Sequence, residues 1–276
     1  MDITGNNMLI DINNNNTGQT LSHAFMTKKT TALRLRMRNN KDLANGTLND
    51  KFLLKYLRAR DYDIDESYKL IKGYFQMRKS NPEMFRTTSD VRELVNASVC
   101  RVLPHRGPAG ETIFIVRAGQ WNLSKWSAAD TLAATITELE LAALDEETQK
   151  NGVIEVMDIR GFTMFHFLRL NPFVVKLGTD ITDRCLPLKF KRIHVINGNR
   201  FMQLAWTLVK PLLGESIKSR IVFHGSDLTK LYDDIPRDLL PSTVGGTWEQ
   251  PPCIIDAKKS QYLDDKLKTY WNNNMI

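Results

Sequence analysis

The sequence has few of the residues that build disulfide frameworks or metal centres. Its three cysteines, Cys100, Cys185 and Cys253, are odd in number and far apart, with no C-x-x-C pair among them. This spacing fits neither a small disulfide-bonded fold nor a structural zinc site. We therefore expect free thiols in a reducing compartment, and no metal.

Long apolar runs are also missing. A transmembrane helix needs about 20 consecutive apolar residues, whereas the apolar stretches here, such as 201–209, are shorter or contain polar side chains. The opening residues, MDITGNNMLIDINNNN, place acids where a secretory signal carries cations, and they lack its apolar core. The sequence predicts a cytoplasmic protein.

Common enzyme motifs are absent as well: there is no P-loop, no dinucleotide fingerprint, no hydrolase elbow and no zincin motif. The five histidines are scattered. His194 and His224 lie in or beside strand-like stretches and could meet in space, where a hydrogen-bonded core pair is favoured over a metal or catalytic pair. The sequence predicts a protein that is not an enzyme and uses no cofactor.

The start of the chain divides into a tail and a helical region. Six of the first sixteen residues are asparagine, and such a segment buries too little apolar surface to offset its ordering entropy, so 1–19 is predicted to be disordered. Apolar residues then recur at helical spacing on either side of a polar break at 61–65. We assign 20–95 to an all-helical lobe.

Beyond residue 95 the pattern changes to an alternation of strands and helices. Short stretches rich in β-branched residues predict strands, and the segments between them have helical spacing. This alternation predicts an α/β domain with a mostly parallel sheet at 96–250, followed by a C-terminal extension at 251–276. The predicted strands are 112–117, 153–158, 193–197 and 220–224, and the predicted helices lie near 128–149, 170–183 and 200–219.

Positive charge is concentrated in one segment. The chain carries a net charge of +7, and residues 181–220 hold eight basic and two acidic residues, which accounts for six of these charges. An excess of this kind attracts nucleic acid, anionic lipid or acidic protein. Nucleic-acid binding would require interleaved aromatics or a known reading motif, and the sequence shows neither. An anionic membrane is therefore the favoured partner, and no nucleic acid is expected.

The same segment contains a helix that is apolar around more than half of its circumference, at 201–217. Two interpretations remain open. It is either a buried core helix, or a helix with one face on an internal cavity and the other able to contact a membrane. Lys218 and Arg220 follow it and favour the second, because cations beside an apolar face meet lipid phosphates.

Several motifs in a fixed order resemble the CRAL-TRIO lipid-transfer family. They are FLLKYLRARD at 52–61, ETQKNG at 147–152, DIRGF at 158–162, KPLL at 210–213 and the double glycine at 245–246. The resemblance covers about residues 30–250 and comes closest to the branch of tocopherol-transfer and retinaldehyde-binding proteins. It implies a helical lobe followed by an α/β domain that encloses an apolar cavity, with a mobile gate helix at 199–220.

The resemblance also implies site residues. The cavity positions fall on Leu132, Thr135, Leu139, Ile154, Ile181, Thr182, Leu186, Phe190 and Ile193, and on the gate residues Phe201, Ala205 and Leu208. Phosphoinositide-binding positions fall on Arg60, Lys189 and Arg220, reinforced by Lys191, Arg192 and Lys218. Ser216 replaces one basic residue of that cluster, which predicts a weaker or rearranged site.

Together these features predict a carrier that binds one hydrophobic small molecule, a tocopherol-like, retinoid-like or carotenoid-like lipid. It would transfer this cargo to phosphoinositide-containing membranes and associate with them reversibly as a peripheral protein. The alternative is a phosphoinositide-sensing regulatory or scaffold module that uses its cavity for phospholipid.

Overall fold

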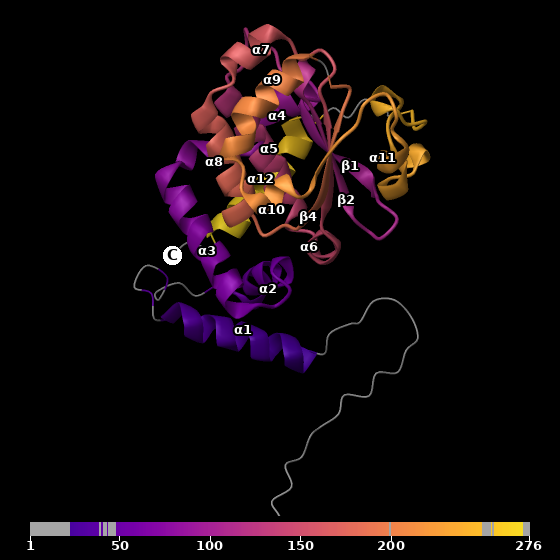
Figure 1. Ribbon diagram of the computed structural model, residues 1–276. Coiled ribbons are helices and arrows are strands. Elements are labelled where there is room, and N and C mark those ends of the chain that lie inside the picture. Colours follow the sequence, from indigo (N-terminus) through magenta and orange to yellow (C-terminus); the bar gives the residue numbers. More distant parts are fainter. Residues whose placement is uncertain are drawn as a thin grey trace, which may run out of the picture.

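The fold combines a group of N-terminal helices with a sheet that helices cover on both faces (Figure 1). The computed structural model describes residues 23–38, 40, 43, 48–198, 200–249, 255 and 257–272. The tail predicted at 1–19 lies outside these residues. The sequence-based prediction of a helical region followed by a helix-covered α/β sheet is confirmed.

The N-terminal helices begin and end where local chemistry requires it. They are α1 (His23–Arg38), α2 (Asp50–Ala59), α3 (Ile64–Ser80) and α4 (Thr88–Asn96). The Asn49 side chain accepts a hydrogen bond from the Phe52 amide at the start of α2, and Asp63 accepts one from the Glu66 amide at the start of α3. The predicted polar break at 61–65 overlaps the turn between these two helices, and its last two residues begin α3.

The sheet has five strands in the order β1-β2-β3-β4-β5. Strands β2 to β5 run parallel, and β1 pairs antiparallel with β2 at the edge. Two of the four predicted strands match β2 and β3 residue for residue, whereas β1 was not predicted. The bounds are β1 (Cys100–Arg106), β2 (Thr112–Arg117), β3 (Val153–Asp158), β4 (Phe190–Ile196) and β5 (Ile221–Phe223).

The two faces of the sheet carry different helices (Figure 1). On one face lie α5 (Ala128–Ala142), α8 (Pro172–Arg184) and α9 (Arg200–Val209). On the other face, α11 (Thr229–Asp234) packs through Leu231 against Ile154 and Val156 of β3. Because β3 is covered on both sides, its apolar side chains alternate between two separate layers.

Short elements connect these layers. The α-helices among them are α6 (Glu146–Asn151), α7 (Met164–Arg169) and α10 (Glu215–Lys218). The 3₁₀ turns are η1 (Pro82–Met84), η2 (Ala118–Gln120), η3 (Lys210–Leu212), η4 (Arg237–Leu239) and η5 (Ser242–Val244).

The segment predicted as one gate helix is divided. Helix α9 ends at Val209, η3 follows, and α10 begins only at Glu215. Pro211 lies in η3, and proline both lacks an amide hydrogen and clashes with the preceding helical turn. The predicted gate therefore consists of the regular helix α9, the 3₁₀ turn η3 and the four-residue helix α10.

Helix α12 (Ala257–Asn272) fastens the end of the chain to the rest of the molecule. The Ser89 amide of α4 donates to Asp264 Oδ1 at 3.2 Å, and Trp271 Nε1 donates to Glu140 Oε2 of α5 at 3.0 Å. The Lys55 ammonium of α2 lies 3.9 Å from the centre of the Tyr270 ring. The predicted C-terminal extension thus contains a packed helix that contacts three earlier elements.

Candidate functional site

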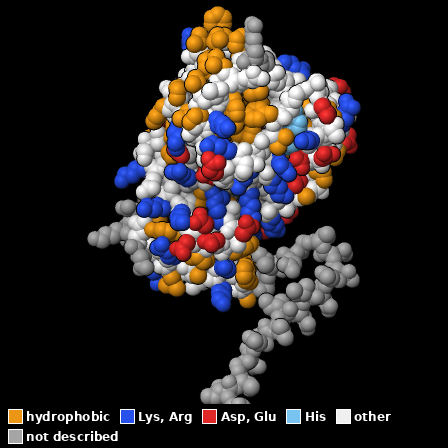
Figure 2. Space-filling view, in the orientation of Figure 1, with side chains coloured by type: hydrophobic (Ala, Val, Ile, Leu, Met, Phe, Trp, Pro, Cys, Tyr) orange, Lys and Arg blue, Asp and Glu red, His pale blue; other side chains and the backbone are white. Residues whose placement is uncertain are grey.

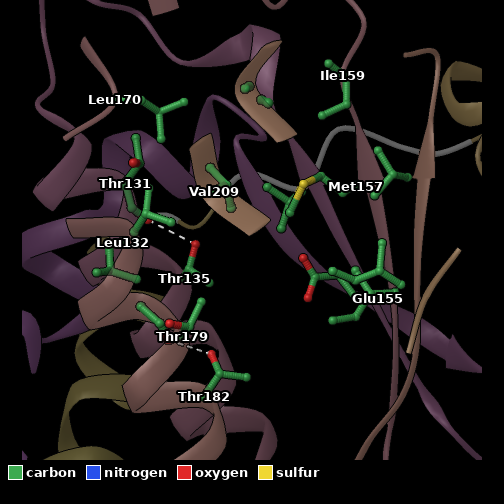
Figure 3. A pocket seen from close by; sticks show the side chains of 18 of the residues that line it. Thr131, Leu132, Thr135, Glu155, Met157, Ile159, Leu170, Thr179, Thr182 and Val209 are labelled. Carbon is green, nitrogen blue, oxygen red and sulfur yellow. Dashed lines mark hydrogen bonds between the residues drawn. The ribbon is translucent and has the colours of Figure 1, made fainter. Parts of the chain in front are cut away.

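An apolar cavity of about 400 Å³ lies between the sheet and the helices α5, α8 and α9. Figure 3 shows its two sides, with helices carrying Thr135 and Thr182 on one and strands carrying Glu155 and Met157 on the other. Almost all lining side chains are apolar. Sites with this composition bury most of a ligand against hydrophobic walls and orient it through a few polar groups.

The strand side of the cavity follows from the period of two in β3 and β4. Glu155 and Met157 of β3 face the cavity, as do Ile193 and Val195 of β4. An irregularity in the pairing of β3 with β4 falls at Lys191, between Phe190 and Arg192. Both Phe190 and Ile193 therefore line the cavity, although an unbroken alternation would place them on opposite faces.

Helix α9 closes the cavity with one face and turns the other outward. Met202, Ala205, Trp206 and Val209 line the cavity. Leu208 lies on the outer face and is 56% exposed. The arrangement is that of the second sequence interpretation, in which one face of the helix lies on a cavity, rather than that of a core helix buried on all sides.

A second hollow, of about 920 Å³, lies where the N-terminal helices meet β4 and α10. Four of the basic residues predicted to bind phosphoinositide line this basic groove: Arg60, Lys189, Lys191 and Arg220. Figure 2 shows Lys and Arg side chains gathered around α10 and the neighbouring end of β4. Ser216 lines the groove as well.

Hydrogen bonds and ion pairs hold the groove residues in place. Arg60 donates to the carbonyl oxygen of Asp183 at 2.7 Å, Lys191 pairs with Glu111 at 2.9 Å, and Lys189 pairs with Asp61. Burial lowers the pKa of the Arg60 guanidinium, and the nearby Arg220 lowers it further. Cations held close together in this way favour the arrival of a multivalent anion.

Family models match both parts of the chain. The CRAL/TRIO domain matches residues 96–246, and the CRAL/TRIO N-terminal domain matches residues 26–73. The chain belongs to the CRAL/TRIO family. The resemblance stated from the sequence motifs is confirmed.

Similar sequences include proteins named alpha-tocopherol transfer protein-like and clavesin. The mouse (Mus musculus) alpha-tocopherol transfer protein-like sequence is 33% identical over 218 residues, covering 78% of this chain and 64% of the relative. Clavesin-1 of Xenopus laevis is 31% identical over 235 residues, covering 83% of this chain and 71% of the relative. This CRAL/TRIO chain therefore spans less than two thirds of the length of its mouse relative.

A solved structure shares the fold at low sequence identity. The crystal structure of Sfh5 superposes with a TM-score of 0.56 at 13% identity, covering 91% of this chain and all of the other. Among the described residues, no helix combines the length and apolarity that crossing a bilayer requires.

Seven of the twelve predicted cavity residues lie on the CRAL/TRIO cavity, and five lie elsewhere. On the cavity are Leu132, Thr135, Leu139, Thr182, Phe190, Ile193 and Ala205. The lining does not include Ile154, Ile181, Leu186, Phe201 and Leu208.

Each of these five residues lies away from the cavity for a physical reason. Ile154 faces the opposite side of β3, where it packs in the layer under α11. Ile181 and Leu186 are fully buried in the core shared with the N-terminal helices. Phe201 is partly buried at the start of α9, and Leu208 lies on that helix's outer face.

Sequence reasoning missed Glu155 and Trp206, which both line the cavity. The alternation of β3 carried the missing signal: Ile154 and Glu155 are neighbours, so one of them must face each side of the sheet. The positions implied by the family resemblance include Ile154 and not Glu155. For Trp206, the helical period shared with Met202 and Val209 was the available signal.

Two predicted phosphoinositide residues lie outside the lining of the groove. Arg192 comes within 3.6 Å of Asp234 on α11, because the irregularity in β4 turns it to that face of the sheet. Lys218 pairs with Glu215 at 2.8 Å within α10.

The cavity and the groove are separated by a thin partition. Among the described residues, Thr182 and Phe190 alone line both of them.

His194 and His224 do meet, on the sheet face that points away from the cavity. His194 Nδ1 lies 2.9 Å from His224 Nε2, and His194 Nε2 lies 3.2 Å from Asp234 Oδ2. Burial lowers the pKa of His194 to about 4, so the pair is neutral at physiological pH. The arrangement is the hydrogen-bonded core pair that the sequence favoured.

Proposed function

We propose that this protein is a carrier that binds one hydrophobic small molecule and transfers it to phosphoinositide-containing membranes, without catalysis. One observation carries the proposal: an apolar cavity is closed by a helix, α9, whose outer face exposes two leucines, Leu204 at 45% and Leu208 at 56%. Such a helix can exchange its contacts with the cavity for contacts with lipid without exposing apolar surface to water.

The cavity supports an isoprenoid-type cargo, such as a tocopherol, retinoid or carotenoid. Its volume of about 400 Å³ lies in the range of small-molecule sites, roughly 300–1,000 Å³. The similarity to proteins named alpha-tocopherol transfer protein-like supports the same class. The polar groups along the walls are few, so the walls select mainly by shape.

Exposed apolar side chains support docking at a membrane. Phe165 and Leu168 of α7 are 72% and 69% exposed, and Phe173 at the start of α8 is 68% exposed. Figure 2 shows hydrophobic side chains gathered at the end of the molecule formed by α7. Because α7 contacts α9, this docking tip adjoins the helix that closes the cavity.

The basic groove supports recognition of an inositol phosphate headgroup by Arg60, Lys189, Lys191 and Arg220. A phosphate group would replace the Lys189–Asp61 ion pair, whose carboxylate is exposed, so that the pair is weak in water. Arg192 and Lys218 lie nearby and add to the positive field. In this mechanism the headgroup holds the protein at the membrane while α9 moves aside and the cargo leaves.

Native mass spectrometry of the purified protein, followed by extraction of bound lipid, tests the proposal. A stoichiometric isoprenoid supports the carrier, and transfer of that lipid between vesicles completes the case. The separate basic groove also favours a second function, a phosphoinositide-sensing module, for which a tightly bound phospholipid and no transfer would be expected. Turnover of the extracted lipid by the protein would overturn both.

A further inference from the structure

One carboxyl group interrupts the apolar cavity. Glu155 is the only ionisable residue among the described residues that line it. The residue sits in β3, the middle strand of the sheet, between Phe114 of β2 and Ile193 of β4. Figure 3 shows its carboxyl group pointing away from the strand into the cavity, toward the helices that carry Thr135 and Thr182.

The carboxyl has no partner among the described residues. No hydrogen bond or ion pair to Glu155 is found within the described part of the chain, and desolvation alone perturbs it. Burial raises its pKa to about 7. The cost of a buried charge favours the protonated form of the carboxyl, which about half of the molecules carry at pH 7 and most carry at pH 6. In this form it can donate one hydrogen bond and accept others.

The threonines of the opposite wall already use their hydrogens. Thr135 donates to the Thr131 carbonyl at 3.0 Å, Thr182 to the Gly178 carbonyl at 2.9 Å, and Thr179 to the Lys176 carbonyl at 2.8 Å. With these bonds in place, the hydroxyls offer a ligand the lone pairs of their oxygens. Among the lining side chains of the described residues, the protonated Glu155 carboxyl and the Trp206 indole thus have a hydrogen to give to a ligand, while both walls offer acceptors.

A hydroxyl group on the cargo fits this arrangement. It would accept the hydrogen of Glu155 and donate its own hydrogen to a threonine oxygen or to the second oxygen of the same carboxyl. A hydrocarbon would leave the buried carboxyl unpaired, and a ligand with only an acceptor would satisfy Glu155 alone. Sites built around a buried polar group discriminate strongly against ligands that leave this group unpaired.

We propose that Glu155 is the specificity-determining residue of the cavity and that the cargo is a lipid alcohol, whose hydroxyl group hydrogen-bonds to its carboxyl. This inference rests on the proposed carrier function and adds the polar class of the cargo. It also accounts for a carboxyl at a strand position where the cavity otherwise carries apolar side chains.

The test compares retinol with the hydrocarbon that differs from it only by lacking the hydroxyl group. Trp121 and Trp206 line the cavity, so energy transfer from tryptophan to the polyene reports binding of either probe. Three proteins are compared: the wild type, Glu155→Gln, which keeps hydrogen bonding without a titrating group, and Glu155→Met, which keeps the bulk and removes hydrogen bonding. Melting curves verify that all three are folded.

We expect the wild type to prefer retinol over the hydrocarbon by about tenfold, the effect of leaving one buried polar group unpaired. Glu155→Gln should keep most of this preference, and Glu155→Met should lose it through weaker retinol binding. An equal preference in the wild type and Glu155→Met would overturn the inference while leaving the carrier intact. Tighter binding of retinylamine than of retinol would also overturn it, because a cation would then be the partner. If the wild type binds neither probe, the carrier function fails, and the inference fails with it.

Discussion

Gly73 of α3 lies so close to the end of α8 that a Cβ atom at this position would stand 2.0 Å from the carbonyl oxygen of Arg184. Only a residue without a side chain permits this approach. Helix α8 also carries Gly178 and Thr182 of the cavity wall. The contact therefore sets the distance between the N-terminal helices and one side of the cavity.

Replacing Gly73 with alanine should destabilise the protein by about 2 kcal/mol, because α3 and α8 must move apart. Helix propensity alone predicts the opposite sign, a gain of about 1 kcal/mol for alanine over glycine inside a helix. Urea unfolding distinguishes the two. Gly225→Ala is the control, since a Cβ there meets nothing within 4 Å, and equal stability of the two variants would contradict the steric explanation.

Charge reversal in the basic groove should slow cargo transfer. With Lys189→Glu and Arg220→Glu together, transfer to vesicles containing phosphoinositide should fall at least tenfold, because each basic residue near an anionic surface contributes about 1 kcal/mol. Cargo affinity should hardly change, since neither residue lines the cavity. A fluorescence assay of transfer between donor and acceptor vesicles measures the rate.

The matched control for this charge reversal is Lys266→Glu with Lys268→Glu on the exposed side of α12, outside the groove. It changes the net charge by the same amount. If both double variants slow transfer equally, net charge rather than the groove governs docking.

Removing the exposed aromatic rings near the docking tip should weaken membrane binding. Phe165→Ser with Phe173→Ser should reduce partitioning onto vesicles by about tenfold or more, because both rings can then no longer enter the bilayer. Thermal stability should stay nearly constant, since these side chains are mostly exposed. Vesicle sedimentation provides the measurement, with Leu35→Ser and Tyr262→Ser as exposed controls elsewhere; an equal loss with that pair would contradict a localised docking tip.

The buried carboxyl should also appear in the pH dependence of folding. Because burial raises the pKa of Glu155 to about 7, the folded state holds a proton that the unfolded chain loses near pH 4.5. At pH 4 the carboxyl therefore hardly changes the free energy of unfolding. Between pH 4 and about pH 7 it destabilises the folded state increasingly. Compared with the wild type, Glu155→Gln should be about equally stable at pH 4 and about 3 kcal/mol more stable at pH 8.

Urea unfolding of both proteins at the two pH values supplies this comparison. Burial also raises the pKa of Glu138 to about 7, and that of the Cys100 thiol beside Glu155, but both groups are common to the two proteins and cancel in the difference. A stability difference independent of pH would show that Glu155 does not titrate as described.

Much of the fold could be predicted because its elements carry unbroken patterns. The β-branched residues of β2 and β3 predicted the bounds of these strands, and helical spacing on either side of a polar break predicted α2 and α3. Strand β1 escaped prediction because Arg101, Pro104 and the basic residues after it interrupt its apolar pattern. Hydrogen bonding to β2 stabilises β1 as a strand. The local sequence pattern does not predict a pairing between two separate segments.

The site was harder to predict than the fold, because the lining of a cavity depends on orientation rather than on composition. Ile154 and Glu155 illustrate this: they are neighbours in one strand, yet a single step along the chain moves a side chain from the core to the cavity. Arg192 shows the same effect in the basic segment. There, one irregular residue in β4 turns it toward Asp234 on α11.

The thin partition between cavity and groove bears on how such proteins diversify. Since Thr182 and Phe190 are the only described residues common to both linings, substitutions at Glu155 or Trp206 can change which molecule is carried without altering the surface that selects the destination. Substitutions at Lys189 or Arg220 can change the membrane that the protein selects while the bound ligand stays the same. Genes that descend from one ancestor can therefore evolve ligand specificity and membrane specificity in separate mutational steps.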